Sequence, residues 1–435
     1  MKDIRELGAN DEKAMIAKGT ARLYIVMFLV WLAGIALVLL ILSRSLGFRR
    51  YLLSVDFRAF YTGGQMALRG VGADFYDLPT QYRWQSEFAP ELSDLSDLYP
   101  FFSPPFVAVP LMLPASLPYE SAYIVWGLLN AALMALVCSL LVAMLAEAGQ
   151  SAQFRALELG LTFLPVWVAV VQGQVSFILV LALLFGWRAL RFGKDWQAGL
   201  GLALLLARPQ LVFVPALILI WKRRPQALAG LALGAVALML LSWLLVGWQG
   251  LSGYGRLLAS ALTWGNTYAL HPQRMHTWRG FLYLLLGTDD PAQVQIRWLA
   301  GVALALMLLL WSWRGPWDAR SPRFDLQWSL LVIVTLFTSP HLYSHDLSLL
   351  VVPGALVARY LAIQPPRGLQ YRLLVLLLPL GYLMPIATLL WATRLRLQFS
   401  VLFYVLAIFV LLWALLKVPQ ASAARAVWPP YKDAK

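Results

Sequence analysis

Cysteine and acidic residues are scarce in this chain of 435 residues, and several familiar motifs are missing altogether. The single cysteine, Cys138, lies inside an apolar run, so no disulfide can form within the chain. The sequence has no Walker loop, no Gly-x-Gly-x-x-Gly fingerprint, no Gly-x-Ser-x-Gly elbow and no cysteine-rich metal motif. These absences argue against a nucleotide substrate, and we predict neither a nucleotide nor a cofactor.

Charge is also scarce, whereas long apolar runs dominate. Charged residues make up 13% of the chain and hydrophobic residues 60%, and the mean hydropathy is +0.70. Apolar runs recur from residue 21 to residue 417, which is more than a soluble core can bury. We therefore predict an all-α polytopic membrane protein. Its net charge of +14 fits cytoplasmic loops and anionic lipids as partners rather than nucleic acid.

The apolar runs predict about twelve transmembrane spans. The first is too long for the apolar part of a cleavable signal peptide, so we interpret it as a signal anchor that follows a cytoplasmic segment, 1–20. The transmembrane domain covers 21–417 and precedes a cytoplasmic tail, 418–435. Two spans are too short to face lipid alone and are expected to pack inside protein. The predicted spans are 21–43, 119–146, 155–171, 174–190, 196–207, 209–221, 226–247, 293–313, 325–338, 345–361, 371–391 and 397–417.

Basic residues divide the connections between these spans into two sets. If the spans alternate in direction, one set collects most Lys and Arg, and the positive-inside rule places it in the cytoplasm with both termini. The other set faces outward from the plasma (inner) membrane. It includes two long loops, 44–103 and 248–292, and all four histidines. We therefore expect the active site on the outer, periplasmic face.

Asp56 stands where the first span gives way to the first outer loop. A carboxylate between aromatic residues at a membrane boundary is costly to keep unless it has a partner or a task. It can cap an amphipathic helix running through Tyr61, and a second amphipathic helix is expected at 79–89. Capping and catalysis are compatible, because a cap leaves one carboxylate oxygen exposed. We assign Asp56 as the catalytic residue and leave the capping interpretation open.

Two short outer connections carry amides and a cation. Gln172-Gly173-Gln174 is either a tight turn or a pair of amides that bind sugar hydroxyls. Arg208 precedes Pro209, which disfavours helical geometry at Arg208. It either reaches lipid headgroups or presents charge to an anionic substrate. We assign Arg208 to the phosphate of a donor. Sugar or acceptor binding is assigned to Tyr61, Gln172, Gln174, Gln210 and Tyr343.

The later outer segments add histidine and arginine. Arg274 and Arg279 lie in 263–280, together with His271 and His276, and bind either substrate phosphate or lipid headgroups. His341 and His345 have helical i, i+4 spacing after Pro340, which is expected to open a helix. That spacing also suits a metal ion, but no third-ligand pattern accompanies it, so we predict no metal. Arg274, Arg279, His341 and His345 are assigned to the donor phosphate.

Aromatic residues mark the point where the first outer loop returns to the membrane. The run Tyr99-Pro100-Phe101-Phe102-Ser103-Pro104-Pro105 is followed by Phe106. Prolines in the first turn of a helix are ordinary starts. The aromatic rings can also form a lip on which a lipid chain or a sugar ring rests. We assign Phe101, Phe102 and Phe106 to lipid binding.

The outer segments are informative as an ordered series. In chain order they are Asp56–Gly64, Leu68–Gly70, Phe75–Asp77, Ser103–Pro105, Pro110, Pro118, Gly173–Gln174, Arg208–Gln210, Ser339–His341 and Asp346. This series resembles glycosyltransferase family 87, which includes polyprenyl-phosphate-mannose-dependent mannosyltransferases of the GT-C fold. The family more often has Lys-Pro where this chain has Arg208-Pro209. The resemblance implies a GT-C-type bundle, a catalytic Asp in the first outer loop, a lipid-linked sugar donor, no nucleotide and no obligatory metal.

The sequence thus predicts a membrane glycosyltransferase that builds glycolipids of the cell envelope. We expect it to move a mannose-like hexose or a pentose from polyprenyl phosphate to a lipid or glycan acceptor, with inversion and with Asp56 as general base. The alternative is a transporter or flippase of a lipid-linked sugar, which predicts ionisable residues near mid-span and repeated halves. A non-enzymatic assembly subunit is a third interpretation.

Overall fold

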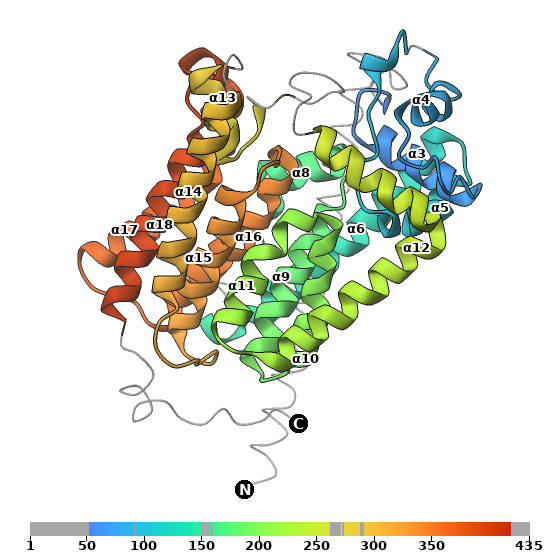
Figure 1. Ribbon diagram of the computed structural model, residues 1–435. Coiled ribbons are helices and arrows are strands. Elements are labelled where there is room, and N and C mark those ends of the chain that lie inside the picture. Colours follow the sequence, from blue (N-terminus) through green and yellow to red (C-terminus); the bar gives the residue numbers. More distant parts are fainter. Residues whose placement is uncertain are drawn as a thin grey trace, which may run out of the picture. The chain divides into compact units, whose positions relative to one another are not determined.

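The computed structural model describes residues 52–90, 92–149, 153, 157, 160–261, 271, 274–287 and 291–418. The chain divides into two compact units, Met1–Ser54 and Val55–Lys435. The predicted N-terminal segment, the first span and residues 419–435 of the predicted tail lie outside the described residues. Every regular element within the described residues is a helix, as the sequence predicts (Figure 1).

The second unit begins with short helices that form one end of it (Figure 1). They are α3 (Phe57–Leu68), α4 (Leu78–Ser86) and α5 (Val109–Ala115), with the 3-10 turns η1 (Leu95–Asp97) and η2 (Pro105–Ala108) between α4 and α5. The two helices predicted for the first outer loop are thus present as α3 and α4. The Asp77 carboxylate caps α4 by accepting a hydrogen bond from the backbone N–H of Thr80 at 2.9 Å.

Six of the described helices are long and apolar enough to cross a membrane, which is the character of an integral membrane protein. They are α6 (Tyr119–Met144), α12 (Pro225–Ala261), α14 (Pro291–Ser312), the segment Ser344–Ile363, α17 (Leu369–Leu395) and α18 (Phe399–Lys417). The segment Ser344–Ile363 joins the 3-10 helix η7 (Ser344–Leu350) to α16 (Val351–Ile363). The count of about twelve spans stays a prediction.

Shorter helices complete the unit. They are η3 (Ala146–Ala148), α8 (Leu164–Val171), α9 (Ser176–Arg191), α10 (Asp195–Leu202), η4 (Ala203–Ala207), η5 (Pro209–Leu211), α11 (Phe213–Trp221), α13 (Trp278–Leu286) and α15 (Pro322–Thr338). Within the predicted second outer loop, 248–292, residues 248–261 are helical, because α12 continues to Ala261. The assignment of 248–292 to the outer side stays a prediction. Gly247, at φ 65°, breaks the helix and redirects this last part.

The short predicted span 196–207 is helical in the structure as α10 and η4, and it packs against α12. A Cβ atom on Gly199 of α10 would lie 1.8 Å from the carbonyl oxygen of Ala227 in α12. A Cβ atom on Gly230 of α12 would lie 2.1 Å from the carbonyl oxygen of Trp196. The two helices therefore approach backbone to backbone, as small residues allow in membrane bundles. This contact buries one face of a helix that is too short to stand alone in lipid.

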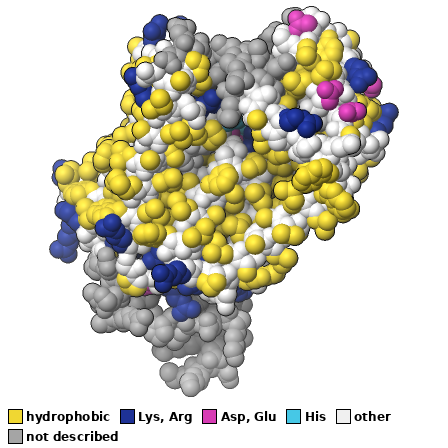
Figure 2. Space-filling view, viewed as in Figure 1, with side chains coloured by type: hydrophobic (Ala, Val, Ile, Leu, Met, Phe, Trp, Pro, Cys, Tyr) yellow, Lys and Arg dark blue, Asp and Glu magenta, His cyan; other side chains and the backbone are white. Residues whose placement is uncertain are grey.

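The two ends of the unit differ in chemistry. One end, the polar end, carries α3, the turn Gln172–Gln174, Arg208 and η7. The other, the basic end, carries the turns that hold Arg191, Lys222–Arg224 and Lys417. On the face shown in Figure 2, hydrophobic side chains cover the middle, while Lys and Arg lie toward the ends. This separation matches the two sets of connections that the sequence distinguishes.

Phe101 belongs to the interior of the first outer loop and not to a lipid-contacting lip. Its side chain is 1% exposed and packs edge-on against Phe60 and Phe75. A Cβ atom on Gly63 would lie 2.6 Å from the Phe101 ring, so α3 carries glycine where the ring lies against it. The predicted lipid contact of Phe101 is therefore corrected to a packing role, because a buried ring is shielded from the bilayer.

Two buried glutamines hold this loop in place. On α4, Gln81 accepts a hydrogen bond from the Phe101 backbone N–H at 2.8 Å and donates to the Phe75 carbonyl at 3.0 Å. One turn later, Gln85 pairs in the same way with both backbone groups of Tyr99, at 3.0 Å each. These amides satisfy backbone groups that a buried irregular segment would otherwise leave unpaired.

A buried ion pair and its hydrogen bonds join four helices near the basic end. Asp325 of α15 and Arg359 of α16 are 0% and 1% exposed and form a direct salt bridge. Trp187 of α9 donates to Asp325 Oδ1 at 3.2 Å, and the Arg359 Nε donates to the Met144 carbonyl at 3.1 Å. Removing one partner of such a pair leaves an uncompensated buried charge, which costs more than the pair itself contributes.

We expect Arg359→Met to destabilise the protein by about 3–5 kcal/mol, because Asp325 then stays buried with only Arg191, at 3.9 Å from its Oδ1, as counter-ion among the described residues. Adding Asp325→Asn should restore much of this loss, since both charges are gone and Trp187 keeps an acceptor. Melting temperatures of the purified variants would measure both effects. The exposed Arg372 is the matched control, and Arg372→Met should change stability by less than about 0.5 kcal/mol. A double variant no more stable than the single one would contradict this account.

Candidate active site

Asp56 lies immediately before α3 and faces the turn between α8 and α9. Its backbone is in the helical region and its side chain makes no capping hydrogen bond to α3, so the capping interpretation is wrong. Instead, the backbone N–H of Asp56 donates to Gln172 Oε1 at 2.9 Å, and Asp56 Oδ2 accepts from Gln174 Nε2 at 2.6 Å. The side chain is 36% exposed, and among the described residues Asp56 Oδ1 has no hydrogen-bond partner.

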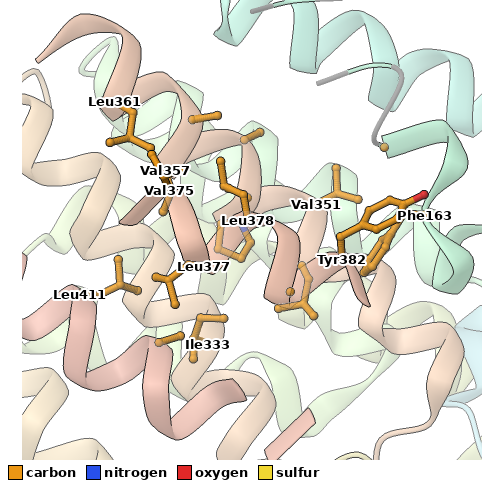
Figure 3. A pocket seen from close by; sticks show the side chains of 18 of the residues that line it. Phe163, Ile333, Val351, Val357, Leu361, Val375, Leu377, Leu378, Tyr382 and Leu411 are labelled. Atoms are coloured by element: carbon orange, nitrogen blue, oxygen red, sulfur yellow. The ribbon is translucent and has the colours of Figure 1, made fainter. Parts of the chain in front are cut away.

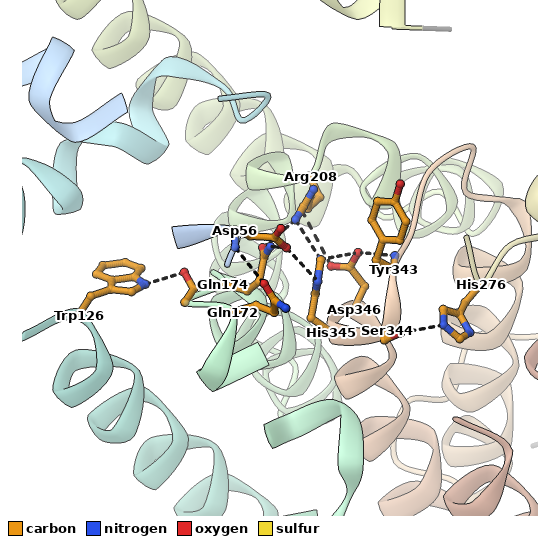
Figure 4. Close-up of polar contacts among 11 residues, drawn as sticks. Asp56, Trp126, Gln172, Gln174, Arg208, His276, Tyr343, Ser344, His345 and Asp346 are labelled. Atoms are coloured by element: carbon orange, nitrogen blue, oxygen red, sulfur yellow. Dashed lines mark hydrogen bonds and ion pairs between the residues drawn. The ribbon is translucent and has the colours of Figure 1, made fainter. Parts of the chain in front are cut away.

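Gly173 allows the turn and α3 to meet. Its φ of +65° is strained for any residue with a side chain, and a Cβ atom there would lie 2.7 Å from Phe57 Cβ. The turn is fixed from its other side by α6, where Trp126 donates to the Gly173 carbonyl and Tyr123 to the Val171 carbonyl, both at 2.8 Å. The two glutamines thus reach Asp56 from a rigid turn (Figure 4).

Arg208 approaches the same amide from the α10–α11 connection. Its Nη2 donates to Gln174 Oε1 at 2.9 Å, so a single amide contacts both Asp56 and Arg208. The backbone of Arg208 is non-helical, at φ −131° and ψ 85°, as expected for a residue before proline. Within the described part of the chain, the Nη1 of Arg208 has no hydrogen-bond partner and remains available to an anion.

His345 and Asp346 complete the polar cluster at the start of η7. His345 is 5% exposed; its Nδ1 lies 3.7 Å from Asp56 Oδ2, and its Nε2 lies 3.2 Å from Asp346 Oδ2. The same Nε2 lies 3.3 Å from Arg208 Nη2. It accepts from the guanidinium in one tautomer and donates to Asp346 in the other, and in both states Nδ1 faces Asp56.

Asp346 also holds the backbone that leads into η7. Its Oδ2 accepts from the Tyr343 backbone N–H at 3.2 Å, and its Oδ1 lies 3.9 Å from Arg208 Nε. Among the described residues, these last two atoms are buried and lack hydrogen-bond partners. The sequence places Asp346 next to His345 and at the end of the ordered series of outer segments, but no role was assigned to it.

His341 does not share a helix with His345. Residues 339–343 are irregular and η7 starts only at Ser344, so the prediction that Pro340 opens a helix bearing both histidines is wrong. Pro340 has no backbone N–H to donate. The helix starts instead at Ser344, where the Asp346 carboxylate accepts a hydrogen bond from the Tyr343 backbone N–H. The His341 ring packs edge-on against Tyr343 at 4.9 Å, and its carbonyl accepts from Gln210 at 3.2 Å. Burial, with a smaller contribution from Arg208, lowers the pKa of His341 to about 3.

His276 fastens η7 to neighbouring helices, a role that sequence reasoning did not assign. Its Nε2 lies 2.9 Å from Ser344 Oγ, and its Nδ1 lies 3.0 Å from Ser400 Oγ of α18. Its backbone N–H donates to the Leu342 carbonyl at 2.8 Å. Burial lowers the pKa of His276 to about 4, with His345 the next cause, so the ring is neutral at pH 7.

Of the other predicted residues, Tyr343 borders the cluster, with its ring 6.2 Å from that of His345, and the rest lie elsewhere. The Tyr61 hydroxyl donates to the Leu117 carbonyl at 2.8 Å, and its ring packs against Tyr119. Arg274 is exposed, whereas Arg279 is buried and lies over the Tyr283 ring. The Tyr343 hydroxyl accepts from the His271 backbone N–H at 2.9 Å. Phe102 and Phe106 are partly buried, and their predicted lipid contact stays a prediction.

The cluster therefore combines a partly exposed carboxylate, two amides, a guanidinium and an imidazole. No group of three or more His, Cys, Asp or Glu side chains within the described residues is arranged to hold a metal ion. The arrangement suits proton removal from a hydroxyl at Asp56 and charge stabilisation at Arg208. These groups lie at one end of an integral membrane protein whose described elements are all helical, which is the class of an enzyme embedded in the membrane.

The model of glycosyltransferase family 87 matches residues 101–340, more than half of the chain, and the chain belongs to this family. This confirms the resemblance found in the sequence. The chain is also similar to the polyprenol-phosphate-mannose-dependent alpha-(1-2)-phosphatidylinositol pentamannoside mannosyltransferase of Mycolicibacterium smegmatis (strain ATCC 700084 / mc(2)155), with 28% identity over 256 residues. The alignment covers 59% of this chain and 58% of the relative. No solved structure matches the chain.

The neutral state of His276 predicts a pH dependence of stability. The pKa of a histidine in an unfolded chain is about 6.5, and that of His276 in the folded protein is about 4. The unfolded state therefore binds more protons below pH 6.5, and stability falls as the pH is lowered toward 4. Between pH 7 and pH 5 this single group should cost about 2 kcal/mol.

Melting temperatures at pH 7 and pH 5 for the wild-type protein and for His276→Gln would check this pH dependence. The variant should start less stable, because one serine contact is lost, but should lose less stability on acidification. His341 contributes in the same direction and is present in both proteins, so the difference between the two slopes isolates His276. Equal slopes would contradict the neutral, buried state of this ring.

Proposed function

We propose that the protein transfers a sugar from a polyprenyl-phosphate donor to a hydroxyl of a lipid or glycan acceptor. The observation that carries the proposal is the amide of Gln174, which contacts a carboxylate with one end and a guanidinium with the other. A glycosyl phosphate has the matching pair of reaction centres, an anomeric carbon under attack and an anionic leaving group. Membership of glycosyltransferase family 87 and the donor named for the relative support the same chemistry.

Asp56 acts as the general base. The acceptor hydroxyl reaches Oδ1, while Oδ2 stays bound to Gln174. As the acceptor oxygen bonds to the anomeric carbon, its proton passes to Asp56 and the bond from the anomeric carbon to the phosphate oxygen breaks. Attack from the face opposite the phosphate inverts the configuration at the anomeric carbon. A second active-site carboxylate is not required, because the leaving phosphate departs with the electron pair as a stable anion.

Arg208 stabilises the departing phosphate. Its Nη1 is available and its Nη2 is held by Gln174, so the guanidinium is oriented before the donor binds. Gln210, two residues after Arg208, donates a hydrogen bond to the His341 carbonyl, and the His341 ring packs edge-on against Tyr343. Because its pKa is lowered, His341 is neutral at pH 7 and can donate a hydrogen bond but adds no charge. Arg274 and Arg279 remain candidates for outer contacts with phosphate or headgroups.

His345 and Asp346 orient the two reacting groups rather than contact the donor. Both nitrogens of the buried His345 ring face protein groups, with Asp56 on one side and Arg208 and Asp346 on the other. Such a supporting contact fixes the rotamer of Asp56 and the position of Arg208. We therefore propose a positioning role for His345 in place of direct phosphate binding.

The relative named above suggests the transferred sugar, and the distribution of basic residues suggests the membrane face of the site. The relative named above uses polyprenol-phosphate mannose, which supports a mannose-like sugar for this chain. The basic end of the unit carries Arg191, Lys222–Arg224 and Lys417, and the positive-inside rule places such residues in the cytoplasm. The polar end would then open on the outer face, where nucleotide sugars are absent and lipid-linked donors are used.

Reconstitution tests the proposal directly. The purified full chain in lipid nanodiscs would receive labelled polyprenyl-phosphate mannose and candidate lipid or glycan acceptors, with and without chelator. We expect a labelled product whose formation does not depend on the chelator. Translocation of the donor in proteoliposomes without product formation would instead support a transporter.

Asp56→Asn should fold normally and bind the donor but lose about 10²–10⁴-fold in turnover, because one positioned base contributes that much. Asparagine keeps an oxygen for the Gln174 amide, so the turn should stay in place. Asp74→Asn is the matched control, since Asp74 is an exposed acid in the same outer loop and should leave turnover unchanged. Single-turnover rates with saturating donor would measure both variants. Unchanged turnover in Asp56→Asn would remove Asp56 from the mechanism.

A further inference from the structure

A long apolar cavity lies apart from the polar cluster, between α15, α16, α17 and α18 (Figure 3). Its volume is about 490 Å³. The lining runs along α16 from Val351 to Ala362, a stretch of about 16 Å of helix. Phe163, Tyr382 and Leu411 contribute from neighbouring segments. The cavity is therefore elongated along the direction in which a lipid chain crosses the membrane.

The wall of this cavity can accept only hydrocarbon. Its lining has no charged side chain, and its polar side-chain atoms are the hydroxyls of Tyr371 and Tyr382. The Tyr382 hydroxyl is already bonded to the Thr162 carbonyl and hydroxyl oxygens, both at 3.0 Å. A sugar or headgroup placed here would lose its hydrogen bonds to water without replacement. An unsubstituted chain loses nothing.

The cavity begins where the polar cluster ends. Leu350 lines it and is the last residue of η7, the same 3-10 helix that starts with Ser344 and carries His345 and Asp346. A 3-10 helix rises about 2 Å per residue, so Leu350 lies about 10 Å along the helix from His345. A phosphate held by Arg208 and the near end of the cavity would thus be separated by about the 10 Å that this part of η7 spans.

Small residues shape one wall. Gly354, Ala358 and Ala362 follow one another at every fourth position of α16 and all line the cavity. In membrane helices such spacing often brings a second helix close. Here a Cβ atom on Gly354 would meet nothing within 4 Å among the residues that the structure describes, so the space beside Gly354 is open there. Branching methyl groups of an isoprenoid fill regular indentations of this kind, whereas a linear acyl chain leaves them empty.

We infer that this cavity binds the isoprenoid chain of the donor, with the phosphate at Arg208 and the first isoprene units bridging the distance between the two sites. The inference rests on the proposed function for the identity of the phosphate at Arg208. It places the chain between α16 and α17 and not at the aromatic residues near Phe106. A single lipid chain occupies the cavity, because a polyprenyl phosphate carries only one chain.

Gly354→Leu should plug the cavity without displacing protein atoms, since the space above Gly354 is open. The kcat/KM for a decaprenyl-phosphate sugar should fall on the order of tenfold or more, because a misplaced chain misplaces the reacting phosphate. A geranyl-phosphate sugar is too short to depend on the cavity and should be used as well as by wild type. Gly127→Leu on α6 is the matched control, also in open space and away from the cavity, and should change neither value. Unchanged use of the decaprenyl donor by Gly354→Leu would overturn the inference.

Photo-crosslinking provides a readout that does not need turnover. Wild-type protein in nanodiscs would be irradiated with decaprenyl phosphate, without sugar, carrying a diazirine on its chain. We expect labelled peptides from α16 and α17, with labelling competed by decaprenyl phosphate but not by phosphatidylglycerol. Equal labelling by a diazirine phospholipid, or labels confined to other helices, would overturn the inference. Labelling of α16 and α17 without sugar transfer would overturn only the proposed function, and transfer without such labelling would overturn only the cavity assignment.

Discussion

The amide of Gln174 is the contact on which the polar cluster depends. It donates to Asp56 and accepts from Arg208, so one side chain joins a carboxylate and a guanidinium from distant parts of the chain. A direct Asp–Arg salt bridge would neutralise both groups and leave neither for a substrate. An amide between them satisfies one oxygen of the acid and one nitrogen of the guanidinium, and keeps the others available. The size of the Gln174 amide therefore sets the spacing between the Asp56 carboxylate and the Arg208 guanidinium.

The rest of the fold fixes that amide. Gly173 lets the turn lie against Phe57, and α6 holds the same turn through two backbone carbonyls. On the opposite side, η7 supplies His345 and Asp346 and is fastened by His276 to α18. The buried glutamines of α4 order the first outer loop, which positions Asp56. Each of these contacts satisfies a buried polar group, which explains why irregular segments persist at this end of a membrane protein.

Many residues of the site could be identified from the sequence, because a polar residue beside a membrane span is costly unless it has a partner or a function. Asp56, Gln172, Gln174, Arg208 and His345 stood out as polar residues beside apolar runs, and the structure brings these five together. The same reasoning misplaced Phe101, since an aromatic residue at a membrane boundary is equally suited to lipid contact and to loop packing. It also put His341 and His345 on one helix, because i, i+4 spacing carries no information on where a helix starts.

The sequence by itself determined the class, the helical architecture and the two chemically distinct ends, since hydropathy and charge act locally and are readable residue by residue. The sequence also indicated the family, through a series of short segments in a fixed order. Only the tertiary structure decided that one amide joins Asp56 to Arg208, that Asp346 and His276 support the cluster, and that a cavity along α16 starts where η7 ends. These features depend on distances between residues that are far apart in the chain, by 34 and 137 positions for the contacts of Arg208 with Gln174 and His345, and such distances are set by the packing of whole helices.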